Sequence, residues 1–382
     1  MTRTAVFYIS GHGFGHASRD IEVINAMLAR REDVRVLART SAARWLFEKT
    51  IRTRGARRGG LDCGPGFDLH AGEVDTGVVQ IDSLRLDEGE TIRRARAFMR
   101  TIEGRIDTEV AFLHTHEAAI VVSDIPPLGI AAALRAGVPA VALGNFTWDW
   151  IYAGYADAAD IAREIADIYR LADSALRLPM HGGFDVFRQI IDIPLIARRS
   201  TRDPAETRRT LGLPEAERLV LVSFGGYGLN GLDFDALSRL EGCMALVGSS
   251  LPLGELPAAL RHGRRGSVLP FDEHAMYRAG IRYEDLVRAV DVVVTKPGFG
   301  IIAECIANDT ALLYTSRGRF VEYDVLVREM PRFIRAQYIN REDLFAGRWA
   351  PHLEALFAQP SPPERPRVDG ADVAAELLLD MI

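Results

Sequence analysis

Cysteine is scarce in this chain and lysine is almost absent. Of the 382 residues, 3 are cysteines (Cys63, Cys243 and Cys305), an odd number spread far apart in the sequence. They indicate neither a disulfide framework nor a zinc site, and they fit a reducing compartment. Among the 46 basic residues only Lys49 and Lys296 are lysines. Because lysine is so rare, Lys296 inside a glycine-rich loop is hard to regard as background.

Long apolar runs and the common metal-binding motifs are missing as well. No stretch of 18 apolar residues occurs and the first residues carry no cleavage signal, so we expect a cytoplasmic protein with no transmembrane segment. The sequence contains no His-Glu-x-x-His, no suitable Asp-x-Asp loop, no Gly-x-Ser-x-Gly elbow and no Walker-type loop, so we expect no metal ligands and no cofactor. A net charge of −6 argues against a general nucleic-acid binder.

Short apolar runs alternate with helical patterns along the chain. Such runs are typical of strands buried on both faces of a parallel sheet, and the alternation predicts a doubly wound α/β architecture. We expect strands at Ala5–Ser10, Val34–Ala38, Ala119–Val122, Ala140–Leu143, Leu219–Ser223, Met244–Val247, Val290–Thr295 and Ala311–Tyr314. We expect helices at Arg19–Arg30, Glu88–His114, Pro127–Ala136, Ala158–Leu171, Pro204–Leu211, Tyr283–Ala289, Gly300–Ala307 and Val373–Ile382.

The length and the proline pattern predict two domains. A chain of 382 residues is too long for a single typical core. Prolines punctuate the stretch from Leu178 to Arg202, and a fresh helix–strand series follows it. We therefore expect one Rossmann-like domain at 1–195 and a second at 196–365, facing each other across a cleft, which is a favoured place for a ligand. A terminal helix at 366–382 follows, and packing back on the first domain is one option for it.

The loop Gly11-His-Gly-Phe-Gly-His16, after the first expected strand, is the most informative motif. In open α/β sheets ligands bind at the carboxyl ends of strands, where a helix start can face an anion. Glycines let a ligand approach the backbone, and histidines suit proton transfer near neutrality. An ordinary turn with surface histidines is the other interpretation. NAD binding is disfavoured, because the second strand is followed by Arg39-Thr40 rather than by the acidic residue that binds a ribose.

A second motif on the same rim is Asp124, at the end of Ala119-Ile-Val-Val-Ser-Asp124. A histidine and an aspartate form a familiar general-base pair, in which the carboxylate fixes the imidazole tautomer. Alternatively, Asp124 caps the helix that follows Pro126. After the next strand, Asn145-Phe-Thr-Trp-Asp-Trp150 offers two aromatic rings and a carboxylate for a sugar surface, or simply aromatic anchors for a loop.

Three loops follow strands of the second domain. Ser223-Phe-Gly-Gly-Tyr-Gly228 is a glycine turn suited to phosphate. Thr295-Lys-Pro-Gly-Phe-Gly300 presents backbone N–H groups and a lysine to a diphosphate. Glu304, on the first turn of the next helix, can accept two ribose hydroxyls or can merely complement the helix dipole. In the third loop Glu322 or Asp324 can bind sugar hydroxyls, unless this is only a solvated charged loop.

Together these motifs resemble nucleotide-sugar glycosyltransferases of the GT-B fold. The Gly11–His16 loop is similar to the glycine–histidine loop of the peptidoglycan N-acetylglucosaminyltransferase, and the segment from Lys296 to Glu304 is similar to that family's Gly-x-x-Ser-Glu donor helix, although Ile301-Ile302-Ala303 replaces its usual polar residues. A closer resemblance is to the N-terminal, glycosyltransferase-like domain of plant L-arabinokinases. It is carried by Ser10-Gly-His-Gly-Phe-Gly-His16, Leu61-Asp-Cys-Gly64, Val121-Val-Ser-Asp124, Asn145-Phe-Thr-Trp-Asp149, Ile191-Asp-Ile-Pro194 and Ser223-Phe-Gly-Gly226.

The resemblance implies a nucleotide-sugar donor held by the second domain and an acceptor held by the first. In plant sugar transferases of this fold a histidine after the first strand pairs with an aspartate, and His16 and Asp124 occupy those places, with His12 as the second choice for the base. The donor-side residues are Ser223, Gly225, Gly226, Lys296, Gly298, Phe299, Gly300, Glu304 and Glu322. The acceptor-side residues are Gly13, Phe14, Gly15, Arg19, Asn145, Trp148 and Asp149.

Three functions follow from this resemblance. The main hypothesis is a metal-independent glycosyltransferase that needs no cofactor and moves a sugar from a nucleoside-diphosphate sugar to an unidentified acceptor. The second is a nucleotide-sugar epimerase of the same fold, with Glu322 and Asp324 around the sugar. The third is a nucleotide-sugar-binding regulator without catalysis. No galactokinase-type ATP loop follows the matched stretches, so the kinase activity of the plant proteins is not expected of this chain.

Overall fold

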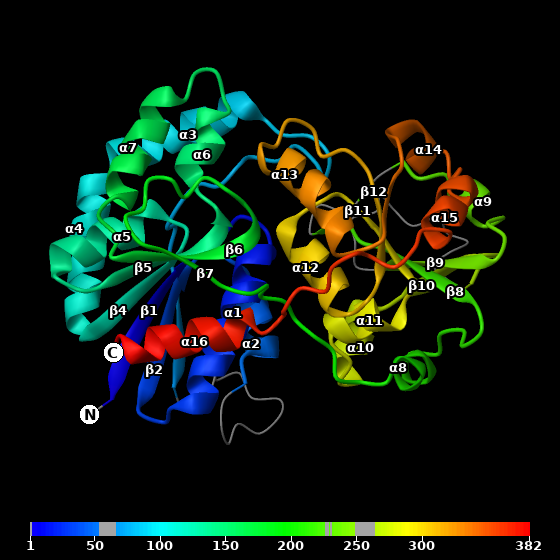
Figure 1. Cartoon of the computed structure of the whole chain (residues 1–382), viewed down its shortest axis with the longest axis horizontal. Coiled ribbons are helices and arrows are strands. Elements are labelled where there is room, and N and C mark those ends of the chain that lie inside the picture. The colour runs from blue at the N-terminus through cyan, green and yellow to red at the C-terminus, as the bar shows by residue number, and fades with distance from the viewer. Residues whose placement is uncertain (1, 53–65, 226–228, 230, 249–263) are drawn as a thin grey trace.

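The computed structural model describes residues 2–52, 66–225, 229, 231–248 and 264–382. Its first half alternates strands and helices from the N-terminus onward (Figure 1). In chain order these elements are β1 (Arg3–Ile9), α1 (Gly15–Arg30), β2 (Val34–Thr40), α2 (Arg44–Thr50), β3 (Phe67–Ala71), α3 (Glu88–Arg100), α4 (Ile102–Thr115), β4 (Ala118–Asp124), α5 (Pro127–Ala136), β5 (Ala140–Phe146), α6 (Trp148–Ala153), α7 (Ala159–Tyr169), β6 (Ser174–Gly182) and β7 (Ile190–Asp192).

The second half repeats this alternation and ends in a helix. Its elements are α8 (Pro204–Thr210), β8 (Arg218–Val222), α9 (Phe234–Leu237), β9 (Cys243–Gly248), β10 (Val268–Phe271), α10 (Glu273–Arg278), α11 (Tyr283–Ala289), β11 (Val292–Thr295), α12 (Phe299–Ala307), β12 (Ala311–Tyr314), α13 (Glu322–Glu329), the 3-10 helix η2 (Met330–Arg332), β13 (Ala336–Tyr338), α14 (Arg341–Phe345), α15 (Ala350–Phe357) and α16 (Gly370–Asp380).

Two parallel sheets organise the described part of the chain. The first has seven strands in the order β3-β2-β1-β4-β5-β6-β7, and the second has six in the order β10-β9-β8-β11-β12-β13. Helices cover both faces of each sheet (Figure 1). The strand order reverses between β1 and β4 and between β8 and β11, and such switch points are where α/β folds bind ligands. The expected α/β class with two Rossmann-like domains is confirmed.

The strands that the sequence missed lie mostly at the edges of the sheets. Every predicted strand is present, and β3, β7, β10 and β13 are the four edge strands. β7 and β13 carry no fully buried residue, so they lack the apolar run by which the central strands were recognised. β6 was missed because Arg177 and Pro179 interrupt its apolar residues.

One predicted helix is broken in the structure. The helix expected at Glu88–His114 is divided into α3 and α4 at Thr101. The Thr101 hydroxyl donates a hydrogen bond to the carbonyl oxygen of Phe98 at 3.0 Å. A threonine that bonds to the preceding turn competes with the regular helical pattern, which explains the break.

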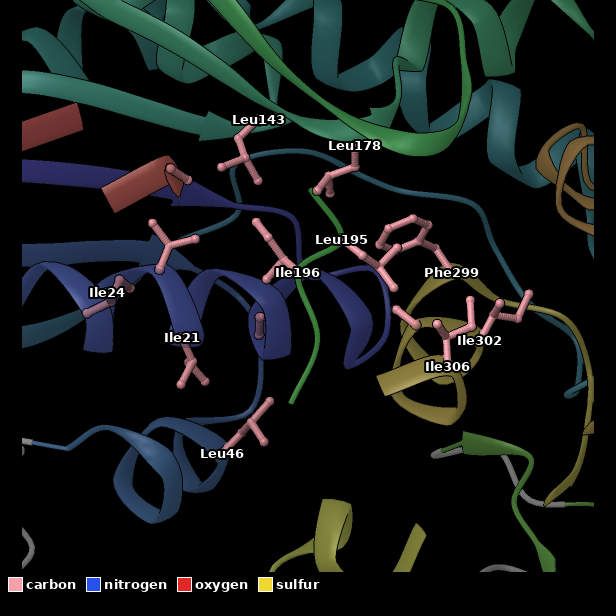
Figure 2. Close-up of a cluster of buried hydrophobic side chains, with 14 of the residues drawn as sticks. Ile21, Ile24, Leu46, Leu143, Leu178, Leu195, Ile196, Phe299, Ile302 and Ile306 are labelled. Atoms are coloured by element: carbon pink, nitrogen blue, oxygen red, sulfur yellow. The ribbon is translucent and has the colours of Figure 1, made fainter. Parts of the chain in front are cut away.

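Apolar side chains join the two domains. Leu195 and Ile196, in the chain that links the domains, lie between Ile21 of α1 and Phe299 and Ile302 of α12, as Figure 2 shows. The starts of α1 and α12 are also in close contact. Gly300 is the second residue of α12, and a Cβ atom added to it would lie only 3.2 Å from the Cα of Gly15 in α1. The amino ends of these two helices therefore face each other across the domain boundary.

The two chain segments that cross between the domains run side by side. The Leu195 N–H donates to the carbonyl oxygen of Arg367, and the Gly370 N–H donates to that of Leu195, both at 3.1 Å. The second crossing leads into α16, which packs on α1 of the first domain, where Arg30 and Asp372 form an ion pair at 2.7 Å. In the described residues no helix is long and apolar enough to span a membrane.

Candidate functional site

The loop that follows β1 brings His16 into the first turn of α1. Gly13 turns the chain with a φ of 74°, a conformation that favours glycine, and the helix begins at Gly15. The His16 side chain points inward with 4% of the residue exposed. Phe146 and Trp148 enclose its ring, with centroids 5.4 and 6.5 Å away. The histidine is therefore a core residue at the sheet's carboxyl edge and not the surface histidine of an ordinary turn.

Asp124 fixes the orientation of His16. It ends β4 next to the last residue of β1 and is fully buried. The Nδ1 atom of His16 lies 2.9 Å from Oδ1 of Asp124 and 3.0 Å from a guanidinium nitrogen of Arg19. In the tautomer with the proton on Nδ1, this nitrogen donates to the carboxylate and Nε2 is left as the free base. The α5 helix has no side-chain cap at Pro126, so the alternative of Asp124 as a helix cap is wrong.

Arg19 also binds Asp124, one helical turn beyond His16. Its Nε donates to Oδ2 of Asp124 at 2.5 Å, and a second guanidinium nitrogen pairs with Oδ1. Burial alone would raise the pKa of Asp124, but Arg19 and His16 outweigh it and hold that pKa below its usual value. Asp124 is therefore an ionised carboxylate with a fixed orientation.

A chain of polar contacts leads from this pair into the second domain. Arg19 donates to Oδ1 of Asn145 at 2.7 Å, and Nδ2 of Asn145 donates to Oε1 of Glu322 at 2.7 Å. Glu322, at the start of α13, in turn lies 3.5 Å from a guanidinium nitrogen of Arg317. Asn145 and Glu322 thus link the two domains, and both are buried. Asp324, by contrast, is exposed.

His12 serves a different purpose from His16. Its Nδ1 accepts a hydrogen bond from the Val78 N–H at 3.3 Å, and its ring stacks near Phe320 of the second domain. Burial lowers the pKa of His12 well below its ordinary value, and the neighbouring Arg317 lowers it further. His12 is therefore a neutral imidazole with one ring nitrogen already engaged.

Trp148, Asp149 and Phe14, which were predicted on the acceptor side, differ in burial and in their distance from His16. Trp148 is 1% exposed and donates from Nε1 to Asp75 at 2.9 Å, so it anchors the core beside His16. Asp149 faces Thr147 and Arg170, and none of its described contacts reaches His16. Phe14 is 40% exposed and meets the ring of Trp45 at the rim of the loop.

Two poorly paired cations lie at the start of α12. Gly298 caps this helix in an extended conformation. A Cβ atom added to Gly298 would lie 3.9 Å from a guanidinium nitrogen of Arg317, so this arginine lies beside the start of the helix. Lys296 donates from Nζ to Oε1 of Gln80, in the first domain, at 3.0 Å. Burial lowers the pKa of Lys296 to about 7, and Arg317 adds to this effect. Nε of Arg317 has no hydrogen-bond partner among the described residues. A buried arginine and a half-buried lysine next to a helix N-terminus form a site suited to an anion.

The other glycine loop of the second domain is described only in part. The Ser223 hydroxyl lies 2.5 Å from that of Tyr283, and Gly225 has a φ of 72°. Gly226, the remaining predicted residue of this loop, lies outside the described residues, as does Cys63. The Phe224 carbonyl oxygen between them accepts a hydrogen bond from Ser83 of the first domain at 3.0 Å.

Glu304 lies in the second turn of α12, so its prediction as a first-turn residue is wrong. The helix begins at Phe299, one residue earlier than expected, because Gly298 takes the cap position. Arg198, from the linker between the domains, pairs with the Glu304 carboxylate. Burial raises the pKa of Glu304 to about 7, although Arg198 opposes the shift. Within the described ranges no group of three or more His, Cys, Asp or Glu residues is arranged to hold a metal ion.

Known proteins share this architecture. No family model matches the chain. It is 30% identical over 379 residues to the L-arabinokinase of Arabidopsis thaliana; the match covers 97% of this chain and 34% of that protein, so the chain spans about a third of the length of this relative. The solved glycotransferase of kitacinnamycin superposes with a TM-score of 0.65 at 15% identity, over 100% of this chain and 99% of the other. SnogD of Streptomyces nogalater gives 0.53 at 16% identity, over 99% of each chain. UGT2 of Phytolacca americana, solved with UDP-2fluoro-glucose and pterostilbene, gives 0.59 at 11% identity, over 99% of this chain and 94% of the other.

This chain has the GT-B fold. The resemblance inferred from the sequence is confirmed, both to GT-B glycosyltransferases and to L-arabinokinase. In this GT-B protein three site residues were not singled out from the sequence: Arg317, Arg198 and Gln80. Arg317 precedes Glu322 in a loop that was noted only for its carboxylates, and an arginine in a loop after a strand of the second domain was a signal that could have been used. Arg198 and Gln80 are far in sequence from the residues they bind.

Proposed function

We propose that the protein is a glycosyltransferase that moves a sugar from a nucleoside-diphosphate sugar to a hydroxyl group of an acceptor, without a metal ion. One observation carries this proposal. The buried His16–Asp124 pair of the first domain and the cationic start of α12 in the second domain belong to the same junction, linked through Asn145 and Glu322. A base for the acceptor and a binding site for a diphosphate thus lie at one junction between the domains.

His16 is the proton acceptor in this proposal. Its Nε2 takes the proton of the acceptor hydroxyl as that oxygen forms a bond to C1 of the sugar. The bond between C1 and the diphosphate oxygen breaks, and its electron pair leaves with the nucleoside diphosphate. The Nδ1–H of the resulting imidazolium stays hydrogen bonded to Asp124. The carboxylate stabilises the imidazolium without itself accepting the proton.

The second domain stabilises the leaving group. Lys296, Arg317 and the free backbone N–H groups at the start of α12 supply positive charge where the diphosphate gains negative charge. These groups are held in a buried junction, where a fixed charge acts more strongly than it does in water. The arrangement supplies the charge stabilisation for which other enzymes of this reaction class use a divalent cation.

Glu304 is the residue proposed to bind the ribose hydroxyls. The carboxylate must be ionised to accept two hydroxyl hydrogen bonds, and with a pKa of about 7 it is only partly ionised near neutrality. Arg198 favours the ionised form. The linker arginine therefore keeps Glu304 competent for the nucleoside.

A binding and turnover experiment tests the proposal. A thermal-shift screen against UDP, GDP, dTDP, CMP and ATP, with their sugar conjugates, should find a nucleoside diphosphate that stabilises the protein, by ~2.7 kcal/mol at 100 times its Kd. Slow hydrolysis of the matching sugar conjugate, with water as the acceptor, then reports turnover. His16→Ala should keep the binding and lose the turnover. No binding by any nucleotide or nucleotide sugar would refute the proposal.

A regulator that binds a nucleotide sugar without turnover is the second candidate. It is favoured by the contacts of Arg19 with both oxygens of Asp124. An ionised carboxylate whose charge is balanced by an arginine raises the basicity of the histidine less than an unpaired carboxylate does. In that case the ligand found in the screen would bind equally well to wild type and His16→Ala, and neither protein would release the sugar. The epimerase hypothesis gains no support, because Asp324 is exposed and Glu322 is bound to Asn145.

A further inference from the structure

Asp20 is an unexplained carboxylate next to the base. It lies on α1, one turn after His16, and it is 0% exposed. Neither of its oxygens has a hydrogen-bond donor within reach among the described residues. A buried carboxylate that accepts no hydrogen bond is costly when ionised. The partner that Asp20 needs is therefore an acceptor for its own proton.

The partner at hand is the Asp124 carboxylate. Asp20 interacts directly with Asp124, and the nearest cation, Arg19, is already committed to Asp124 and Asn145. An ionised carboxylate offers about four acceptor positions. His16 uses one position on Asp124 and Arg19 uses two. One position is left, and a protonated Asp20 has one O–H group to donate.

We propose that Asp20 is protonated and donates a hydrogen bond to Asp124, which makes Asp20 a positioning residue for the His16 base. Burial raises the pKa of Asp20 well above its ordinary value, and the negative charge of Asp124 raises it further, while Arg19 opposes the shift. The other titratable groups around this cluster are His16, Glu322 and Asp75. They are engaged with Asp124, Asn145 and Trp148, respectively. With its fourth position filled, Asp124 cannot rotate away from Nδ1 of His16.

Infrared spectroscopy tests the protonation directly and needs no substrate. Because Glu304, with a pKa of about 7, is also partly protonated at pH 7, the signal of Asp20 is the difference between the spectra of wild type and Asp20→Asn in D₂O buffer at that pH. This difference spectrum should show the carbonyl stretch of one buried protonated carboxyl that the variant has lost. Asp372→Asn, at an exposed ion pair on α16, is the matched control and should leave the band in place. A difference spectrum in which Asp20→Asn removes no protonated carboxyl, or removes the bands of an ionised carboxylate instead, would overturn the proposal.

Turnover tests the positioning role, which rests on the proposed function. Asp20→Leu removes the donor and should lower kcat for hydrolysis of the nucleotide sugar roughly tenfold with little change in KM, because one hydrogen bond to the orienting group is lost. Asp20→Asn keeps a donor of the same shape and should restore most of that loss. If Asp20→Asn loses as much as Asp20→Leu, the charge of Asp20 matters and the proposal is wrong. If wild type turns over no nucleotide sugar, the proposed function fails, and the infrared band still decides the state of Asp20.

Discussion

Replacing Lys296 by methionine should weaken diphosphate binding by a factor that depends on pH. Lys296 lies at the start of α12, and burial lowers its pKa to about 7. A bound phosphate stabilises the protonated amine, so binding requires the proton. Affinity in the wild type is therefore highest below pH 7 and falls as the pH rises through 7, where the free protein loses that proton. The methionine variant has no such proton to lose.

The size of the effect follows from the charges. An ammonium ~4 Å from a phosphate oxygen gains ~4 kcal/mol at an effective dielectric constant of ~20. At pH 6 nearly all of this is available, so Lys296→Met should raise the Kd roughly a thousandfold. At pH 8 the proton must first be taken up, which costs ~1.4 kcal/mol for a pKa of about 7. The variant should then be only about a hundredfold weaker than wild type.

Calorimetric titration with inorganic pyrophosphate at pH 6, 7 and 8 provides the measurement. Pyrophosphate makes the result independent of the nucleobase, and its own titration cancels in the ratio of variant to wild type. Lys296→Arg should bind without the loss at pH 8, because arginine stays charged. Lys49→Met, at the other lysine of the chain, on the exposed side of α2, should bind like wild type. A ratio that is the same at pH 6 and pH 8 would refute the reasoning.

Two further predictions concern the linker and the domain junction. Arg198→Met should raise the pKa of Glu304 further above about 7 and weaken the binding of a nucleoside diphosphate roughly tenfold at pH 7. The binding of pyrophosphate should not change, and Arg198→Lys should show an intermediate loss of nucleotide affinity. Calorimetric titrations with the two ligands measure this, and equal losses for both ligands would contradict it. Gly300→Ala places a Cβ 3.2 Å from the α1 backbone and should destabilise the protein by about 1–3 kcal/mol. Gly104→Ala in the open surface of α4 should stabilise it by up to ~1 kcal/mol, and thermal unfolding should show opposite shifts for the two variants.

The central strands could be predicted from the sequence because burial on both faces demands an apolar run. β1 and β4 are fully apolar over most of their length, whereas the edge strands β7 and β13 are only part-buried and carry no such pattern. The two-domain organisation followed from the same runs and from the length. The predicted strands were therefore those with an uninterrupted apolar run. Most of the missed strands have one neighbour only, and the interior strand β6 was missed because Arg177 and Pro179 interrupt its run.

The pairing of His16 with Asp124 could be predicted because both follow strands of one parallel sheet, and carboxyl ends of parallel strands share an edge. The contacts of Arg198 with Glu304 and of Lys296 with Gln80 join residues 106 and 216 positions apart on different elements. Such contacts depend on how the two domains dock, and no local pattern encodes this. Asp20 was missed for a related reason: a polar residue on a helix is normally solvated, and only the packing shows that it is enclosed.

The network around Arg19 ties the geometry of the base to the docking of the domains. One guanidinium holds both oxygens of Asp124 and the side-chain carbonyl of Asn145. The amide of Asn145 then reaches Glu322 of the second domain at 2.7 Å. Separating the domains would leave the amide N–H of Asn145 and the carboxylate of Glu322 without each other, at the cost of a charge-assisted hydrogen bond. The docked state is thus the one in which the contacts of Asp124 are tied to the second domain, and in the proposed reaction it is also the state that would exclude water from the nucleotide-sugar donor. In the proposed glycosyltransferase, proton acceptance by His16 and protection of the donor from hydrolysis would depend on the same arrangement, because the residues that orient His16 are held from both domains.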